Sequence, residues 1–461
     1  MFNSEKIIKT LTIIIKFFLI GLLLQFFLQT FVTYKLNLSG GIRNIIRAWK
    51  EIILVGLIGF LGYYFYKTNK LKEFWQNFIL KDFTLIFILT IFVTFLVSIF
   101  INQNGLGTYI ISIRYSMTGF LIFIVFFMIS YIFLGTKEIN LVKRYNKSLK
   151  TLLVLSIVRR GIIWIIPRLL EFAGYDQYSV EGKIGSPPPT TYHTQYNAGY
   201  ARNQFLFERP INRGFFLVAF WPIFFILFFK NKKRDEIALR GFFFGLAMLS
   251  TFSRAARIAW IIQTLVLIFL QFKKKFRKIG LYSFLPLLLI FGVVTYIGKD
   301  QIISRQFSNT GHVRRILTAF NDILKKPIWG QGAGSVGPAS YQIKNGSDYN
   351  PENQFMQIWI EYGIFGFLGR MFLYLYLHRI GYKAYQDEHE KKQKIIKKTR
   401  FYGTMVFAFS LGLFGLSIEG MVLHSFVDRM IVYPFMALFG LCFAIYQKSL
   451  KTKKTLTFYD K

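Results

Sequence analysis

Long apolar runs separated by short clusters of lysine and arginine recur along the whole chain. Most of these runs contain about 16 to 20 residues with little or no charge, which is enough for a helix to cross about 30 Å of hydrocarbon. The pattern therefore predicts about twelve membrane-spanning helices, at 11–33, 51–66, 83–101, 116–134, 150–170, 214–229, 237–250, 257–270, 281–297, 356–377, 401–418 and 429–446.

Composition supports the same class. Hydrophobic residues make up 53% of the 461 positions, aromatic residues make up 19%, and the 54 phenylalanines exceed what a soluble core of this size needs. We therefore predict an all-α polytopic integral membrane protein in which residues 1–461 form a single transmembrane domain.

The formal net charge of +36 would also suit a nucleic-acid partner. The lysines and arginines, however, lie mostly between the apolar runs and fall on one side of the predicted membrane, as the positive-inside rule requires. We therefore expect no nucleic acid, place both chain ends in the cytoplasm, and predict two long external loops at 171–213 and 298–355. The basic loop 34–50 departs from the rule, so the span count near it stays open.

Three arginines lie in or beside predicted spans, where a charge is costly unless it faces the bundle interior, a water-filled cavity or an anion. Arg159 and Arg160 lie near the middle of the run IVRRGIIWII. Arg114 lies near the outer end of the fourth span. Anion binding and salt bridges within the bundle remain equal alternatives for the central pair.

The segment SRAAR places Arg254 and Arg257 three residues apart, on one face at the start of a predicted helix. Backbone N–H groups, the helix dipole and two guanidinium groups together suit a phosphate. The structural alternatives are salt bridges in the bundle or contacts with lipid phosphates.

The second external loop contains a predicted amphipathic helix at 311–325, which ends before Pro327. His312, Arg314 and Arg315 lie in its first turn, and its apolar face should pack on the membrane or on the bundle. That face comprises Val313, Ile316, Leu317, Phe320, Ile323 and Leu324.

Two further features follow this helix. Gly330, Gly332 and Gly334 alternate in WGQGAGS, which permits positive φ and a close approach to a ligand. The pair Glu352 and Asn353 then opens the apolar run at 356–377.

The order of Arg314 or Arg315, KPIWGQGAGS and PENQFMQIWIEYGIFGFLG resembles the O-antigen ligase and O-antigen polymerase family of bacterial polytopic membrane glycosyltransferases. In that family a similar GxGxG segment precedes a short HN-like or EN-like pair, which opens a helix with a Glu-x-Gly-x-x-Gly element. In this chain that element is Glu361, Gly363 and Gly366. The turn SRAAR resembles the Ser-Arg-containing external turn of the family.

The resemblance implies a multi-pass enzyme of the bacterial cytoplasmic (inner) membrane with its site facing outward. It implies transfer of a glycan from an undecaprenyl-diphosphate carrier to an acceptor glycan or lipid-linked acceptor, in O-antigen, lipopolysaccharide, capsule or exopolysaccharide biosynthesis. No cofactor and no metal are expected, and other polysaccharide-assembly proteins are further expected partners. Many ligases carry His where Glu352 stands, which favours a polymerase over a ligase.

For this reaction Glu352 is the candidate general base, and Asn353 would orient the base or a sugar hydroxyl. Arg254 and Arg315 would stabilise the leaving diphosphate, together with Arg257, Arg314, Arg159, Arg160 and Arg114. A structural alternative is that Glu352 only caps the span.

Three more residues are weaker candidates. His312 is an alternative base, and Glu361 is expected to pair with an arginine inside the bundle. Tyr196 belongs to a tyrosine-rich first loop that would stack on sugars or form an interfacial belt. Glu419, His424 and Asp428 lack a fourth partner for a metal site.

Two alternatives to an enzyme stay open. A lipid-linked oligosaccharide flippase or transporter would distribute charges through many spans and show internal symmetry. A non-catalytic subunit of a polysaccharide-assembly complex would tolerate loss of Arg254 and Glu352.

Overall fold

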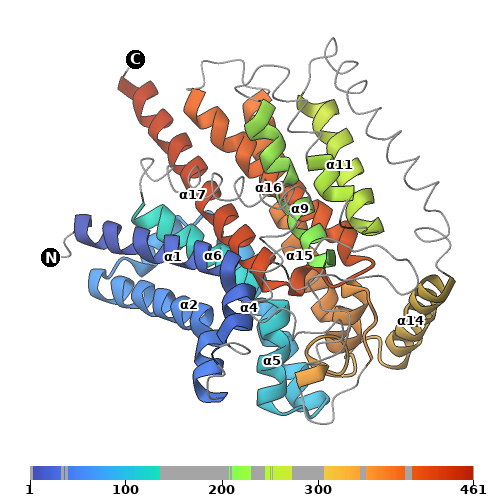
Figure 1. The fold of residues 1–461 in the computed structure, drawn as a ribbon. Coiled ribbons are helices and arrows are strands. Elements are labelled where there is room, and N and C mark those ends of the chain that lie inside the picture. The colour runs from blue at the N-terminus through green and yellow to red at the C-terminus, as the bar shows by residue number, and fades with distance from the viewer. Residues whose placement is uncertain are drawn as a thin grey trace. The chain divides into compact units, whose positions relative to one another are not determined.

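The computed structural model describes residues 4–32, 36, 40–134, 207, 210–229, 244–249, 251, 253–271, 306–342, 349–389 and 397–459. Every regular element in these ranges is a helix, which confirms the predicted all-α class (Figure 1). The predictions for Arg159, Arg160, Tyr196 and nearly all of the loop 171–213 lie outside the described residues.

The chain divides into two compact units. One unit comprises Met1–Val55 and Phe133–Ser304, and the other comprises Gly56–Ile132 and Arg305–Lys461. The expectation of a single transmembrane domain stays a prediction.

The first unit contains α1 (Ser4–Thr30), the beginning of α2 (Gly40–Thr68), α9 (Pro210–Phe229) and α11 (Arg254–Gln271). Helices α9 and α11 pack against each other, as Figure 1 shows in green. The indole Nε1 of Trp221 donates to the Thr264 hydroxyl at 2.9 Å, and the rings of Trp221 and Trp260 meet edge to face at 6.0 Å. Polar and aromatic contacts thus hold the middle of α11 on α9.

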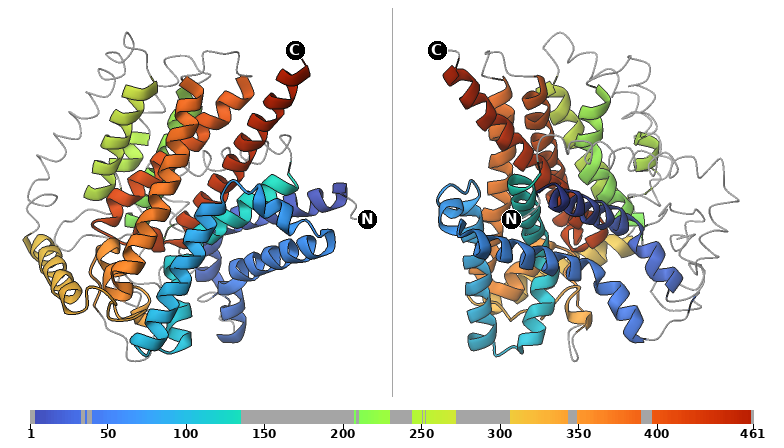
Figure 2. Two further views of the ribbon diagram at one scale, coloured as in Figure 1. Left: turned by 180° about the vertical axis from the view of Figure 1, so that it is seen from behind. Right: turned by 90° about the vertical axis from the view of Figure 1, so that its left-hand side faces the viewer.

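The second unit contains the end of α2 and the remaining helices, which can be followed by their colours in Figure 2. They are α3 (Leu71–Gln76), α4 (Lys81–Leu96) with its continuation η2 (Val97–Ile101), α5 (Leu106–Ser116), α6 (Thr118–Ile132), α14 (Gln306–Lys325), η6 (Ser340–Gln342), α15 (Gln354–His389), α16 (Lys397–Gly420), η7 (Ser425–Val427) and α17 (Arg429–Tyr459).

The core of this unit lies between α6 and α17. Helix α6 is apolar on all sides and most of its side chains are buried, as expected of a helix surrounded by others. Phe123 contacts Phe439 at 5.1 Å between ring centroids, and Phe127 contacts Phe443 at 5.3 Å. Helix α15 packs against both α16 and α4.

Five helices among the described residues are long and apolar enough to cross a membrane, and a sixth span arises if the bent pair α5 and α6, with 64° between its arms, counts as one. The five coincide with the predicted spans 51–66, 83–101, 356–377, 401–418 and 429–446. The structure therefore agrees with a polytopic membrane protein, while the total of twelve spans stays a prediction.

Candidate functional site

The candidate site begins at the first turn of α15, which Asn353 caps. Its side-chain oxygen accepts hydrogen bonds from the backbone N–H groups of Phe355 and Met356, both at 3.0 Å. Its side-chain nitrogen donates to the carbonyl of Met421 at 2.9 Å, in the turn between α16 and α17. Both ends of the amide are engaged, so Asn353 fixes the start of α15 and thereby the residue that precedes it.

Glu352 precedes the cap with a positive φ of 52°, a conformation that non-glycine residues adopt rarely. Its N–H donates to the side-chain oxygen of Asn350 at 3.2 Å, which closes a tight turn. The interpretation of Glu352 as only a helix cap is wrong, because Asn353 performs the capping and the Glu352 carboxylate turns toward α14.

The Glu352 carboxylate contacts two basic side chains of α14. The Nη1 of Arg315 donates to Oε1, and the Nδ1 of His312 lies 2.6 Å from Oε2. The three side chains keep 22% (Glu352), 28% (His312) and 47% (Arg315) of their surface exposed, so the cluster is open to a ligand. The structure thus joins both residues considered as a base with one of the predicted diphosphate-binding arginines.

Tyr349 holds α14 in place beside this cluster. Its hydroxyl donates to the backbone carbonyl of Arg315 at 2.5 Å. Burial, aided by the negative charge of Asp322, raises the pKa of Tyr349 to about 12, so its hydroxyl remains a donor throughout the physiological pH range. Tyr349 was not among the predicted site residues, although its place just before the NPEN segment was a usable signal.

Helix α14 begins at Gln306, five residues earlier than predicted, and ends at Lys325 as predicted. His312 and Arg315 therefore lie inside the helix rather than in its first turn. They share one face with Ala319 and Ile323, which are buried against Val336 and Ile360. This small apolar core fixes which face of α14 is inward, and His312 and Arg315 on that face lie next to Glu352.

The glycine segment meets α15 where that helix is broken at Gly363, which has φ 65° and ψ −165°. The carbonyls of Ile360 and Glu361 accept hydrogen bonds from the N–H groups of Gln331 at 2.6 Å and Gly332 at 3.1 Å. The N–H of Ile364 donates to the carbonyls of Pro327 and Ile328. The loop thus replaces hydrogen bonds that the break removes from α15.

One close approach in the glycine segment is made to α15 itself. A Cβ on Gly330 would lie 2.5 Å from the backbone nitrogen of Gly363. The backbones of the loop and the broken helix are therefore in direct contact, and the glycine segment is a structural joint. We call the contact of residues 327–334 with residues 360–364 the glycine joint.

Glu361 is buried in the glycine joint. Its Oε1 accepts the N–H of Gly334 at 3.1 Å, and its Oε2 accepts the hydroxyl of Ser112 on α5, also at 3.1 Å. The carboxylate therefore ties α5 to the joint, and the charge of Arg370 also acts on it, in line with the expectation that Glu361 pairs with an arginine inside the bundle. No sequence signal pointed to Ser112.

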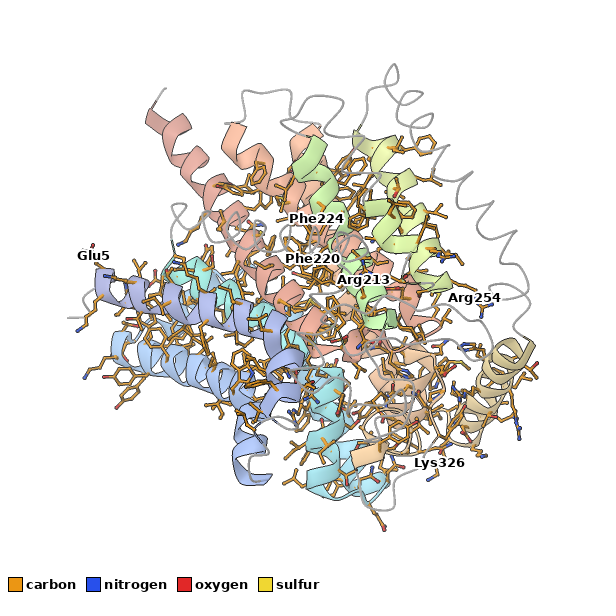
Figure 3. All side chains as sticks on the ribbon, in the orientation of Figure 1. Glu5, Arg213, Phe220, Phe224, Arg254 and Lys326 are labelled. Atoms are coloured by element: carbon orange, nitrogen blue, oxygen red, sulfur yellow. The ribbon has the colours of Figure 1, made fainter. Side chains whose placement is uncertain are left out.

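Arg254 and Arg257 lie at the start of α11, where the Ser253 hydroxyl accepts the N–H of Ala256 at 3.4 Å. Arg257 is buried, and its Nη2 donates to the carbonyl of Leu249 at 2.9 Å. Arg254 is partly exposed and extends from the end of the helix in Figure 3. Since α11 and Glu352 belong to different units, the expectation that these arginines face Glu352 stays a prediction.

Arg213, which the sequence analysis missed, is buried in the first turn of α9 (Figure 3). The next residue is Gly214, and a Cβ there would lie 3.0 Å from that of Ala256 and 3.5 Å from that of Ser253. The start of α9 thus packs against SRAAR, and Arg213 lies in that turn. Its place at the end of the first long loop, in INRGFF, was the available signal.

Other predicted residues lie outside the Glu352 cluster. Arg314 is exposed on a different face of α14, and Arg114 lies in the last turn of α5. Burial lowers the pKa of His424 to about 4, so the imidazole is neutral at neutral pH. Within the described ranges, no three His, Cys, Asp or Glu side chains are grouped to hold a metal ion.

The two contacts of Asn353 predict different effects for two substitutions. Asn353→Ala should lower the free energy of unfolding by about 0.5–2 kcal/mol, because it removes the cap. Asn353→Asp should retain the cap and lose only the donor to Met421. Thermal unfolding of the protein in lipid nanodiscs checks this order, and an Asp variant as unstable as the Ala variant would contradict the capping role.

The comparison with protein families finds a match over residues 239–371 to the family model described as O-antigen ligase. The matched segment includes α11, α14, the glycine segment and the first half of α15. It supports assignment to the O-antigen ligase and polymerase family, as the resemblance read from the sequence indicated. No curated protein matches the chain.

Proposed function

From the O-antigen ligase match over residues 239–371, we propose that this protein is a membrane glycosyltransferase acting on undecaprenyl-diphosphate-linked glycans. It transfers the glycan to an acceptor sugar at the outer face of the bacterial cytoplasmic membrane, and it extends polysaccharide chains as a polymerase. The observation that carries the proposal is the contact of the Glu352 carboxylate with His312 and Arg315 at the exposed head of α15.

The chemistry requires a base, because a sugar hydroxyl is a poor nucleophile. Glu352 takes the hydroxyl proton as the acceptor oxygen attacks the anomeric carbon of the donor. The bond from that carbon to the phosphate oxygen breaks, and its electron pair leaves with the carrier diphosphate. His312, with Nδ1 at 2.6 Å from the carboxylate, holds Glu352 in position and shares the proton.

The leaving diphosphate needs positive charge. Arg315 uses Nη1 for Glu352 and keeps 47% of its side chain exposed, so its other N–H groups are open to phosphate oxygens. We assign Arg254, at the start of α11, to the same negative charge, because helix N-termini and guanidinium groups both favour phosphate.

Reconstitution tests the proposal. Purified protein in liposomes should convert undecaprenyl-diphosphate-linked repeat units to longer chains on the same carrier, and mass spectrometry should detect the released undecaprenyl diphosphate. Movement of intact donor across the bilayer without new glycosidic bonds would instead identify a transporter. Absence of both activities would indicate a non-catalytic subunit.

A deletion strain separates polymerase from ligase. If the protein is a polymerase, cells that lack it still attach single repeat units to the final acceptor and lose only the longer chains. If single units are also lost from the acceptor while lipid-linked chains accumulate, the protein is a ligase.

A further inference from the structure

Helix α14 presents three different faces. The inward face carries His312, Arg315, Ala319 and Ile323, and it meets α15 and the Glu352 cluster. A polar face carries Arg314, Thr318, Asn321 and Lys325, which are all exposed. The third face is apolar and equally exposed, with Val313 at 56%, Leu317 at 60%, Phe320 at 53% and Leu324 at 60% of their surface accessible.

The predicted apolar face is therefore divided. Ile323 packs into the protein, whereas Val313, Leu317, Phe320 and Leu324 recur at spacings of three and four residues on a side that no described residue covers. Four large exposed apolar side chains on one helix face form a patch that soluble surfaces rarely tolerate.

This apolar face continues into the side of a candidate membrane span. Ile328 and Trp329 follow α14 and are both exposed, and the Trp329 ring lies 5.6 Å from the ring of Phe365 on α15. Phe365 begins an exposed apolar stripe on α15 that includes Leu368, Phe372 and Leu375. Since Gln354–Asp387 is long and apolar enough to cross a membrane, that stripe is where lipid would lie.

The charges near the apolar face also suit contact with lipid. Arg314 and Lys325 flank it on the polar side, and Lys326 follows the helix end, marked in Figure 3. Basic side chains beside an apolar helix face bind the phosphates of anionic lipids, and tryptophan is enriched at the level of lipid headgroups.

We propose that α14 lies in the headgroup region of the lipid leaflet at the N-terminal end of α15, with Val313, Leu317, Phe320 and Leu324 inserted among the acyl chains. The inward face then holds His312 and Arg315 at the membrane surface, at the level of lipid phosphates. This surface is independent of the proposed glycosyltransferase activity, because the contacts that define it do not involve a substrate.

Single cysteines test the orientation of α14. Cys442, the only cysteine of the sequence, is buried and is replaced by alanine. Leu317→Cys and Phe320→Cys place a fluorophore on the apolar face, and Thr318→Cys and Asn321→Cys are matched controls on the polar face. The full-length labelled proteins are placed in liposomes of phosphatidylethanolamine and phosphatidylglycerol.

Phospholipids brominated in the acyl chain should quench the label at positions 317 and 320, and aqueous iodide should quench it at 318 and 321. Emission at 317 and 320 should also shift to shorter wavelength. Iodide quenching at all four positions would overturn the proposal by showing a water-facing helix. Protection of 317 and 320 from both quenchers would overturn it as well, because protein would then cover the face. Val313→Cys provides a second apolar position if either variant fails to fold.

Discussion

The Glu352→Gln variant is expected to lose about 10²–10⁴-fold of the glycan-transfer rate, the usual contribution of a general base. Glutamine has nearly the same shape as glutamate and cannot take the proton of the acceptor hydroxyl. It also loses the charge that holds Arg315 and His312 together. The measurement is the initial rate of chain growth on lipid-linked repeat units in liposomes, with donor accumulation in cells as a second readout.

Asp322→Asn is the matched control for this substitution. Asp322 lies on the same helix as Arg315, and its carboxylate pairs with the exposed Lys325 at 2.7 Å. The same loss of a carboxylate charge should therefore leave the rate near that of the unmodified protein. A Glu352→Gln variant that builds chains at the rate of this control would show that Glu352 is not the base.

The Gly363→Ala variant is expected to lose about 3 kcal/mol of stability and most of its activity. The φ of 65° and ψ of −165° at this residue lie in a region that is almost restricted to glycine, where strain alone costs about 1–3 kcal/mol. A methyl group would also overlap the carbonyl of Ile328, so the glycine joint would have to separate. Thermal unfolding in nanodiscs and transfer assays at low temperature measure the two effects.

Gly311→Ala is the corresponding control, since Gly311 lies inside α14 and a Cβ there meets no atom within 4 Å. Alanine should stabilise the helix by about 0.5–1 kcal/mol. If Gly363→Ala unfolds at the same temperature as Gly311→Ala, the broken conformation of α15 is not required for the fold.

The glycine joint explains why two motifs far apart in the sequence belong together. Gly330 brings the loop backbone close to α15, the N–H groups of Gln331 and Gly332 donate to the carbonyls of Ile360 and Glu361, and the break at Gly363 frees those carbonyls. The sequence showed glycines in both segments, and the run at 330–334 was expected to permit positive φ. It gave no indication that each segment is the partner of the other, because backbone hydrogen bonds leave no trace in side-chain pattern.

Glu352 illustrates the same limit. Its identity and its position at the head of a span were visible in the sequence, and both a base and a helix cap were consistent with them. The structure gives the capping hydrogen bonds to Asn353, and the positive φ of Glu352 directs its carboxylate to α14, while the role of Glu352 as the base stays a prediction. The direction of the carboxylate depends on the tight turn at Glu352 and on its contact with Arg315, which lies 37 residues earlier in the chain.

The sequence by itself determined the helical class and the spans at 51–66, 83–101, 356–377, 401–418 and 429–446, because hydrophobicity over about 20 residues is a local property. It also determined that 311–325 would be helical and amphipathic. Only the tertiary structure decided which side of α14 faces the protein, because Ile323 and Leu317 are equally apolar and differ only in what lies next to them. The grouping of His312, Arg315 and Glu352 follows from that choice of face.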